Sequence, residues 1–563
     1  MGAHPRQPNC QRTRVSISSR TIAICIILTL SFPAAARADL PVDEMRKAIE
    51  VGVDYLVSQQ ELDGSWKYDI DWVKGTRYDV GMTSLCTLAL AHTRLPKASA
   101  AMQKGLAYVT QHKPEPTTYT VGLVQMLLFE NGGARHRKLI NRYAWMTVMA
   151  QKRTGVQLGS WGYRIVDWPS RREQQRAVPD APRGRSDNSN SQFGVLGLWF
   201  AQRAGYQVPE KVWKRVKKYY EAAQNPDGGW GYTGRNYQRE TNQRGEGSYL
   251  PMTAASTVSL YLADEALASI NIKQCKMRPE NPAVEKALAW IGNRERLAGG
   301  PYTWYAVERL GIMTGRSEFG GKNWMELGTR DLLARRQWGR DRGGERAARA
   351  FGVLFLARAL EPIIINKLKH KGDWNCDRYD VKKLTEYITV KFQHPKQWRI
   401  VTLDASVDEL LKVPILYVNG HNALDFTEAE KTKIKTYVNR GGTLFAMACC
   451  GKKPFDKSLR ALVAELWPEG RLAPLPKTHS IYSNPRPLVT KPKLLGMAIG
   501  EQGRLGVIYS PYDMCCRWTK GGAAAKGVYD VGANIYFYVS KEGVKLGGVR
   551  EGHRVHTAKG DEK

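Results

Sequence analysis

The sequence predicts a multidomain chain: an all-α (α/α)6 toroid over residues 39–360, followed by an α/β domain with a doubly wound, mostly parallel sheet over residues 361–549. Two observations lead to this prediction. A pair of helical segments recurs at intervals of roughly 55 residues up to about Leu360. After Glu361-Pro362, short apolar strands alternate with helices instead. The 563 residues, 42% hydrophobic and 25% charged, suit a globular protein of two or three domains.

The first 38 residues have the pattern of a secretory signal peptide. Several arginines precede the apolar run 21–32, and Ala36-Arg37-Ala38 follows as an A-x-A cleavage site. We therefore expect cleavage near Ala38 and export to the periplasm or the cell exterior. The apolar run is short for a bilayer span, and no later stretch reaches about 18 apolar residues. We expect no transmembrane helix in the mature protein, and a polar tail at residues 550–563.

Each repeat of the first domain begins with an amphipathic helix, continues through a turn and ends with a more apolar helix. The predicted helix pairs cover residues 47–60 and 78–92, 102–111 and 120–129, 139–152 and the segment after Asp187, 211–224 and 253–266, 284–294 and 302–313, and 324–337 and 345–360. Six hairpins give the (α/α)6 count. The more apolar second helices are expected to form the inner barrel.

The turns inside these hairpins share a Gln, an Asp-Gly pair and a Trp. Asp and Gly end the first helix and permit positive φ. The Trp can pack between hairpins while its ring N–H reaches a backbone carbonyl, so we interpret these residues as structural staples. They are Gln60, Asp63, Gly64, Trp66, Trp161, Gln224, Asp227, Gly229 and Trp230.

The strings Gln59-Gln60-Glu61-Leu62-Asp63-Gly64-Ser65-Trp66 and Gln224-Asn225-Pro226-Asp227-Gly228-Gly229-Trp230 resemble the Q-W repeat of squalene-hopene cyclases. The resemblance covers about 320 residues and implies the toroid that these cyclases share with prenyltransferases. Such cyclases protonate their substrate with the middle Asp of a D-x-D-D string. Here no two Asp residues are adjacent, and the nearest match, Asp69-Ile70-Asp71-Trp72, lacks the last acid.

Protein prenyltransferases, the other enzymes with this ring, hold zinc with Asp, Cys and His. Cys86 and His92 lie six residues apart on one predicted helix, which places them about 240° apart around its axis. The sequence therefore predicts a ring without either chemistry, and we expect no metal or cofactor.

Polar residues at the starts of the second helices are candidates for ligand binding at one mouth of the ring. Aromatic walls with a few convergent polar groups suit a ligand pocket, whereas Asp, Asn and Ser in these places are also ordinary helix caps. The candidates are Thr83, Asp187, Asn188, Ser189, Asn190, Gln192, Tyr302 and Trp304.

The last third of the chain predicts strands at residues 363–369, 399–403, 414–418, 443–448 and 505–509, with helices at 379–391, 427–439, 456–466 and 531–539. In a doubly wound sheet, function gathers beyond the carboxyl ends of the strands. Residues 419–422, Cys449 and Cys450, and residues 510–513 follow strands in this way.

The string L-Y-V-N-G-H-N, followed by T-E-A-E, R-G-G-T-L-F and P-L-P-K-T-H-S-I-Y, resembles an uncharacterised bacterial domain related to the class I glutamine-amidotransferase fold. The resemblance covers roughly residues 363–549. It implies no reaction and no catalytic residues, and the G-x-C-x-G elbow of the amidotransferases is absent.

The cysteines of this domain allow two interpretations. Cys449 or Cys450 is a candidate nucleophile, with His421 or His479 as base. Alternatively, in an oxidising compartment, one of Cys449 and Cys450 forms a disulfide with one of Cys515 and Cys516. We favour the disulfide.

The balance of charge is strongly basic, with 85 Lys and Arg against 53 Asp and Glu and a net charge of +32. This favours an anionic surface or glycan as partner, although the basic residues are scattered and no nucleic-acid-binding motif accompanies them. We expect an exported envelope protein whose toroid binds a ligand or protein partner without catalysis. The alternatives are a polysaccharide-active toroid, using acids such as Asp63, Asp79 or Asp187, and a Cys-dependent hydrolase or transferase.

Overall fold

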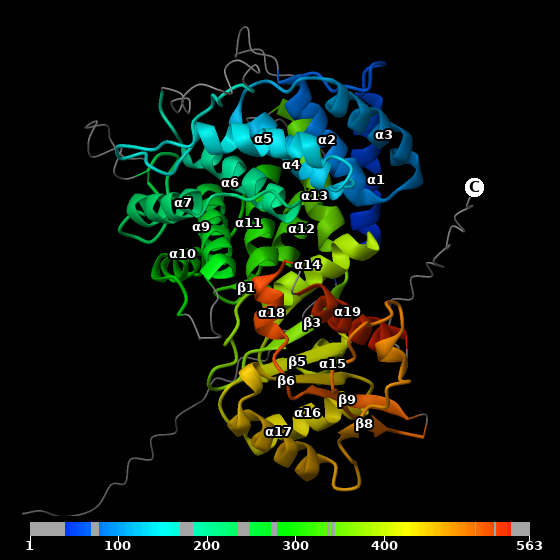
Figure 1. Cartoon of the computed structure of the whole chain (residues 1–563). Helices are drawn as coiled ribbons and strands as arrows, with labels where there is room; N and C mark the ends of the chain where they lie inside the picture. Colours follow the sequence, from blue (N-terminus) through cyan, green and yellow to red (C-terminus); the bar gives the residue numbers. More distant parts are fainter. Residues whose placement is uncertain are drawn as a thin grey trace, which may run out of the picture. The chain divides into compact units, whose positions relative to one another are not determined.

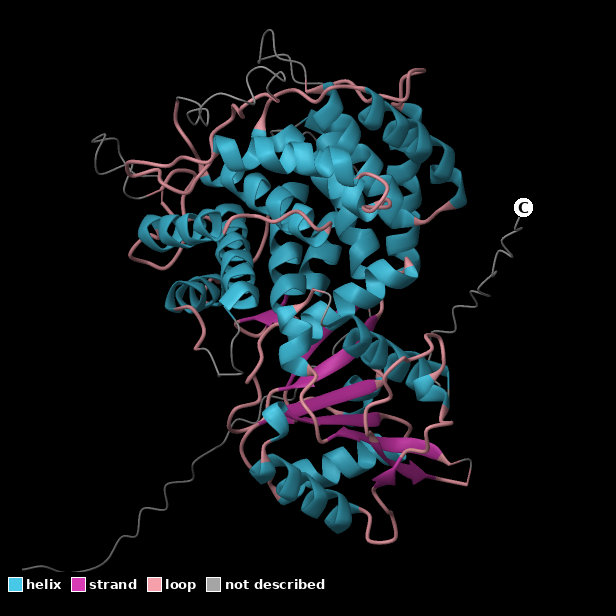
Figure 2. Ribbon diagram, viewed as in Figure 1, coloured by secondary structure: helices cyan, strands magenta, loops and turns pink. Residues whose placement is uncertain are grey.

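The computed structural model describes residues 40–68, 78–168, 184–234, 247–271, 279–334, 338, 344–501, 503–522 and 525–541. The predicted signal peptide, the polar tail and the acidic pair at Asp69 and Asp71 lie outside these residues. The compact unit that begins at Pro41 contains a helical part followed by a part built on a seven-stranded sheet (Figure 1, Figure 2).

Twelve of the described helices form the first part. They are α1 (Val42–Ser58), α2 (Asp79–Thr93), α3 (Pro96–Gln111), α4 (Thr118–Glu130), α5 (Arg137–Ala150), α6 (Asn188–Arg203), α7 (Glu210–Ala223), α9 (Leu250–Asn271), α10 (Pro282–Gly292), α11 (Pro301–Thr314), α12 (Trp324–Ala334) and α13 (Gly344–Ala359). A two-stranded hairpin, β1 (Glu318–Phe319) and β2 (Lys322–Asn323), precedes α12.

The second helices of the six hairpins contact one another in a closed cycle: α2, α4, α6, α9, α11, α13 and again α2. Helix α4 buries every residue from Thr120 to Phe129, as expected for a helix packed on all sides. The outer helix α7 buries only one face, which includes Trp213 and Tyr220. The alternation of amphipathic and apolar helices in the sequence therefore follows the alternation of outer and inner positions. None of the described helices has the length and apolar character that a bilayer crossing requires.

The turns of the hairpins repeat one hydrogen-bond pattern. The ring N–H groups of Trp66, Trp161 and Trp230 donate to backbone carbonyls of the preceding helix, at 2.7, 2.8 and 3.0 Å. The Gln60 amide donates to Gly64 within its own turn and to Ala101 of the next outer helix, α3. Gln224 makes the equivalent pair of bonds to Gly228 and to Ala283 of α10. The Trp anchors the turn, and the Gln ties each hairpin to its neighbour.

The sheet has the strand order β4-β3-β5-β6-β9-β8-β7. Its strands are β3 (Ile363–Leu368), β4 (Gln397–Val401), β5 (Ile415–Gly420), β6 (Thr443–Ala448), β7 (Ala473–Pro474), β8 (Leu495–Ile499) and β9 (Arg504–Ser510). The four pairings from β4 to β9 are parallel, whereas β9–β8 and β8–β7 are antiparallel. The sheet is therefore mixed. The sequence did not predict β7 and β8, because β7 spans two residues and β8 contains a glycine, a residue depleted in strands.

Helices cover both faces of this sheet, as a doubly wound domain requires. Residues of α14 (Asp380–Phe392), α18 (Cys515–Lys520) and α19 (Lys526–Lys541) share one core with the sheet. Residues of α15 (Val407–Leu411), α16 (Glu428–Asn439) and α17 (Lys453–Leu466) share the other. Helix α16 begins with a complete capping box between Thr427 and Glu430, at the position that the sequence predicts.

His92, near the end of α2, lies between two carboxylates. Its Nε2 is 2.7 Å from Glu130 of α4, and its Nδ1 is 3.3 Å from Glu361, which precedes β3. Burial alone would lower the pKa of His92, but the two carboxylates outweigh it and raise the pKa to about 9. The charged imidazole thus connects two inner helices to the start of the sheet.

Ala in place of Gly228 should destabilise the chain more than Ala in place of Gly205. Both glycines have positive φ, +93° and +101°, which costs a non-glycine residue about 1–2 kcal/mol. A Cβ at Gly228 would also lie 2.8 Å from the carbonyl oxygen of Lys286, whereas a Cβ at Gly205 meets nothing within 4 Å. Urea unfolding of the two variants measures the difference; equal losses would contradict the close contact.

The His92→Gln substitution should weaken stability at pH 6 and much less at pH 10. The pKa of His92 is higher in the folded chain than its ordinary value of 6.5, so its contribution is complete below pH 6.5 and is lost as pH rises through about 9. The free energy of unfolding should lose roughly 2–4 kcal/mol more at pH 6 than at pH 10. Burial lowers the pKa of His136, so His136→Gln should add no pH dependence above pH 7.

Candidate metal centre

The parallel strands β3, β5, β6 and β9 end at one edge of the sheet, and a loop with reactive side chains follows each of them. The segment after β3 carries Asp373 and Cys376. His421 follows β5, and Cys449 follows β6. Cys515 lies at the start of α18, five residues after β9 ends. Four segments that are distant in the sequence thus meet at this edge.

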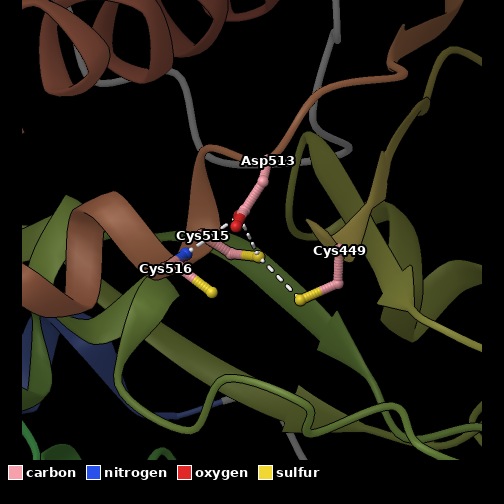
Figure 3. A group of neighbouring side chains, drawn as sticks. All are labelled: Cys449, Asp513, Cys515 and Cys516. Atoms are coloured by element: carbon pink, nitrogen blue, oxygen red, sulfur yellow. Dashed lines mark hydrogen bonds between the residues drawn. The ribbon is translucent and has the colours of Figure 1, made fainter. Parts of the chain in front are cut away.

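Three cysteine thiols converge there. The Sγ atoms of Cys449 and Cys515 are 3.2 Å apart (Figure 3). The Cys376 sulfur lies within 4.8 Å of the Cys449 sulfur. All three side chains are buried, with exposures of 3% or less. Burial of three thiols against one another is an arrangement of coordination chemistry or of thiol chemistry rather than of ordinary packing.

An imidazole completes the group. A ring nitrogen of His421 lies within 4.8 Å of the Sγ atoms of Cys376 and Cys449. The Nδ1 atom of His421 is 2.8 Å from Asp373, which also accepts the backbone N–H groups of His421 and Asn422. The carboxylate therefore holds the proton on Nδ1 and leaves Nε2 as the acceptor nitrogen, the tautomer of a histidine that binds a metal through Nε2.

A buried ion pair helps to fix the position of the Cys376 sulfur through Asn419. The Nζ of Lys367 in β3 donates to Asp380 at 2.6 Å, and both side chains are fully buried. The amide of Asn419 then donates to the other Asp380 oxygen at 3.0 Å and to the Cys376 Sγ at 3.3 Å. This chain of contacts fixes the sulfur relative to the ends of β3 and β5.

The pKa values of the three thiols shift in different directions. Hydrogen bonds from Cys449 and Cys515, together with the nearby Lys367 and His421, hold the pKa of Cys376 well below its ordinary value. Donation to Cys376 raises the pKa of Cys449, and burial raises the pKa of Cys515. Cys376 is therefore the thiol of the three that loses its proton most readily. A bound soft cation would displace the remaining protons.

The donor set fits zinc. Zinc binds thiolate sulfur and imidazole nitrogen in a tetrahedron, with sulfur atoms about 3.8 Å apart, so the Cys449 and Cys515 sulfurs need to separate by only roughly half an ångström. Asp513 accepts a hydrogen bond from the Cys515 thiol at 3.1 Å, and this bond is lost when the thiol gives up its proton to a metal. The Cys516 sulfur is nearby but is disulfide-bonded, so it is not a thiolate donor. Cys449 belongs to two groups of donor atoms that lie within 4.8 Å of one another, one with Cys376 and His421 and the other with Asp513, Cys515 and Cys516. A site of Cys376, Cys449, Cys515 and His421 combines donors from both groups.

Sequence reasoning found part of this group. The structure brings together the candidates His421, Cys449 and Cys515. Cys450 is exposed, and His479 caps the 3-10 turn at residues 480–482 through Ile481. Cys449, Cys450 and Cys515 are all thiols while Cys516 is disulfide-bonded, so the structure joins neither Cys449 nor Cys450 to Cys516.

The sequence interpretation missed Cys376, Asp373 and Lys367. Cys376 and Asp373 follow the end of β3, where the tendency of functional residues to gather after strand ends would have indicated them. Nothing in a single sequence signals that Lys367 is buried, because lysine in a strand ordinarily points to solvent.

Two of the ring candidates have structural partners. Thr83 accepts the backbone N–H of Trp66 at 2.9 Å, as Thr253 does for Trp230 at 3.0 Å. The Trp304 ring N–H donates to Asp331 of the outer helix α12 at 2.7 Å. Thr83 holds the tryptophan of its own hairpin, whereas Trp304 joins α11 to α12 of the next hairpin. Neither side chain joins the group at the ring mouth described next.

The other ring candidates lie at the start of α6. Asp187 is the N-cap, accepting the backbone N–H of Asn190 at 2.7 Å and its side-chain amide at 2.8 Å. Burial raises the pKa of Asp187 to about 6. Asn188 donates to the carbonyl of Gly231 at 2.8 Å.

Ser189, Gln192 and Tyr302 form a small hydrogen-bonded group that joins α6 to α11. The Ser189 hydroxyl is 2.9 Å from the hydroxyl of Tyr302, and Tyr302 donates to Gln192 at 3.3 Å. Tyr119 of α4, which the sequence interpretation missed, donates to Ser189 at 2.5 Å. A ligand role for this group stays a prediction.

The C-terminal part matches a family described as a domain of unknown function (DUF4159), over residues 364–540. The predicted kinship with glutamine amidotransferases has no support among these matches and stays a prediction. No curated protein matches the sequence.

Among solved structures, the apo type II terpene cyclase MstE from Scytonema is similar with a TM-score of 0.32 and 14% identity, covering 52% of this chain and 78% of the cyclase chain. A variant of the same cyclase in complex with geranylgeranyl dihydroxybenzoate matches with a TM-score of 0.34 and 14% identity, covering 56% of this chain and 97% of that one.

Replacing Lys367 with Met should destabilise the chain strongly, because Asp380 is then left buried without its cation. The expected loss in the free energy of unfolding is about 3–5 kcal/mol. Lys371→Met is the matched control, since Lys371 and its partner Asp425 are exposed at the surface and should contribute little. Chemical denaturation of both variants tests this; a mild effect at Lys367 would mean that Asp380 finds another partner or is protonated at little cost.

Proposed function

We propose that the α/β domain is a metal-binding module that holds one soft divalent cation, zinc by preference, through Cys376, Cys449, Cys515 and His421. Two groups of close donor atoms that share Cys449 carry this proposal: Cys376 and His421 lie on one side of its sulfur, and Cys515 lies 3.2 Å from it. Four protein ligands fill a tetrahedral site and leave no open position for substrate. The metal would then be structural, and would tie together the segments that follow β3, β5, β6 and β9.

A structural metal agrees with a chain that acts by binding rather than by catalysis. The absence of D-x-D-D from the sequence, with Thr83 and Trp304 occupied within the ring, favours a scaffold role for the helical part. We extend the proposal to an exported envelope protein that binds a ligand or a protein partner. The disulfide at Cys516 supports an oxidising compartment. Fractionation of cells, with N-terminal sequencing of the recovered protein, tests export; a chain retained in the cytoplasm with residue 1 intact would oppose it.

Purified full-length protein should contain one zinc per chain by inductively coupled plasma mass spectrometry. Ser in place of Cys376, Cys449 or Cys515 should abolish stoichiometric zinc, because each removes a thiolate ligand. Cys86→Ser and Cys450→Ser are the matched controls and should keep it, since Cys86 lies in α2 and Cys450 is exposed. Asp373→Asn should weaken zinc affinity by roughly 10–100-fold through loss of the His421 support. Full zinc in the three Ser variants would disprove this ligand set.

A second candidate function is covalent catalysis by Cys376. The lowered pKa of its thiol and the Asp373–His421 hydrogen bond are the features of a nucleophile with an oriented base. Alkylation by iodoacetamide separates the two functions. A metal ligand is labelled only after chelation, whereas a nucleophile is labelled in protein as isolated and free of zinc. Native mass spectrometry also separates both from a Cys449–Cys515 disulfide, which would lower the mass by two hydrogens.

A further inference from the structure

A cavity lies where the carboxyl ends of several inner helices meet α14. The cavity has a volume of about 460 Å³. Residues near the ends of α2, α4, α6, α11 and α13 line it, together with residues of α14 and the segment 393–398. Its volume is in the range of small-molecule pockets. The cavity shares no residue with the candidate metal centre.

Arg309 of α11 lines this cavity with an unsatisfied charge. Its side chain is fully buried, and none of its three guanidinium nitrogens has a hydrogen-bond partner among the described residues. Its one ring contact places the guanidinium 5.0 Å from the centre of the Tyr305 ring. Arginine keeps its charge in proteins, and a buried cation without a hydrogen-bonded anion is costly. The five N–H donors of this guanidinium are therefore unused by the described residues.

The residues that line the cavity carry more positive than negative charge. Seven basic residues line the cavity against three acidic ones, Glu130, Glu361 and Glu386. These carboxylates already have cationic partners: Glu130 and Glu361 bind His92, and Glu386 binds Lys382 at 2.6 Å. Arg358 has its own partner outside the wall, Glu308, at 2.8 Å.

Lys396 at the edge of the cavity makes no ion pair among the described residues. Burial and the neighbouring Arg94 lower the pKa of Lys396 to about 8, in keeping with a positive potential in this region. Arg94, Arg309 and Lys396 are thus the basic wall residues without a salt bridge among the described residues. Of these three only Arg309 is fully buried, and the carboxylates of Glu130 and Glu308 act on it without a hydrogen bond.

Compensation of helix dipoles does not explain Arg309. Cations near helix carboxyl ends are favoured, and Arg203 and Arg358 occupy the last turns of α6 and α13 in this way. Arg309 is instead five residues before the end of α11, beyond the reach of the terminal carbonyls. It is nevertheless one of the residues that line the cavity.

We infer that this cavity binds an organic oxyanion, a carboxylate or phosphate carried on a compact apolar body. The Arg309 fork presents parallel N–H groups to two oxygens of such an anion. The aromatic side chains Phe129, Trp199, Phe200 and Trp398 supply the apolar wall. An anion that forms hydrogen bonds with Arg309 removes the cost of the buried charge, so the site should discriminate strongly against neutral ligands of the same shape.

Isothermal titration calorimetry on the full chain tests this with 2-naphthyl phosphate, naphthalene-2-carboxylate, neutral 2-naphthol and inorganic phosphate as probes. At least one naphthyl anion should bind about tenfold or more tightly than 2-naphthol and than inorganic phosphate. Arg309→Met should remove that preference and leave 2-naphthol binding unchanged. Arg440→Gln, at an exposed site of the α/β domain, should behave as the unmodified chain.

A melting curve distinguishes a ligand-binding Arg309 from a structural one. Because Met removes a buried guanidinium whose N–H groups have no hydrogen-bond partner among the described residues, the variant without ligand should melt at the same temperature as the parent or higher. If Arg309→Met does not fold, Arg309 is structural and the inference fails. Lys396→Met, which makes a smaller change at the edge of the cavity, should also weaken the naphthyl anions. Equal binding of anion and 2-naphthol, tighter binding of inorganic phosphate, or no binding by any naphthyl probe would overturn the inference.

Discussion

The buried ion pair between Lys367 and Asp380 is the interaction on which the candidate metal centre depends. It fixes the segment after β3 against the sheet, and through Asn419 it reaches the sulfur of Cys376. Buried ion pairs add little to stability relative to apolar packing, but breaking one is expensive. The pair therefore favours one arrangement of this segment over others. It places the cysteine beside the ends of β5 and β6, where the other donors already lie.

The ring depends on a different constraint, namely that each hairpin must be bound to the next for the cycle to close. Gln60 and Gln224 do this with one amide each, which bonds to their own turn and to the following outer helix. Thr83 and Thr253 hold the equivalent tryptophans from the inner side. The repeat in the sequence is thus a repeat of contacts between hairpins. These contacts do not involve the carboxyl ends of the inner helices, so the residues at those ends can differ from one hairpin to the next. The charged cavity lies at these ends.

The sequence predicted the periodic parts of this fold well, because periodicity is a local property. The twelve helices, the change to a sheet after Glu361-Pro362 and the parallel strands up to Arg504–Ser510 all follow from the spacing of apolar residues. Sequence reasoning also placed His421 and Cys449 at one edge of the sheet. The sequence suggested no metal, because Cys86 and His92 of the ring lie on different sides of one predicted helix. Cys376 and Asp373 join the group only through contacts across the sheet, and Arg309 attracts attention only because its partners are missing. Neither property is visible in a linear pattern.

The neighbouring residues Cys515 and Cys516 differ in their chemistry: one is a thiol directed toward Cys449, the other is held in a disulfide. Because of this difference, it matters whether metal binding or oxidation of the thiols comes first as the protein matures. In an oxidant-rich environment, Cys449 and Cys515 are near enough to cross-link, and thiol–disulfide exchange with Cys516 is one residue away. A cation that arrives first masks both thiols and prevents either outcome. The yield of correctly matured protein should therefore be set by a kinetic competition between metal supply and oxidation, and not by the stability of the final fold alone.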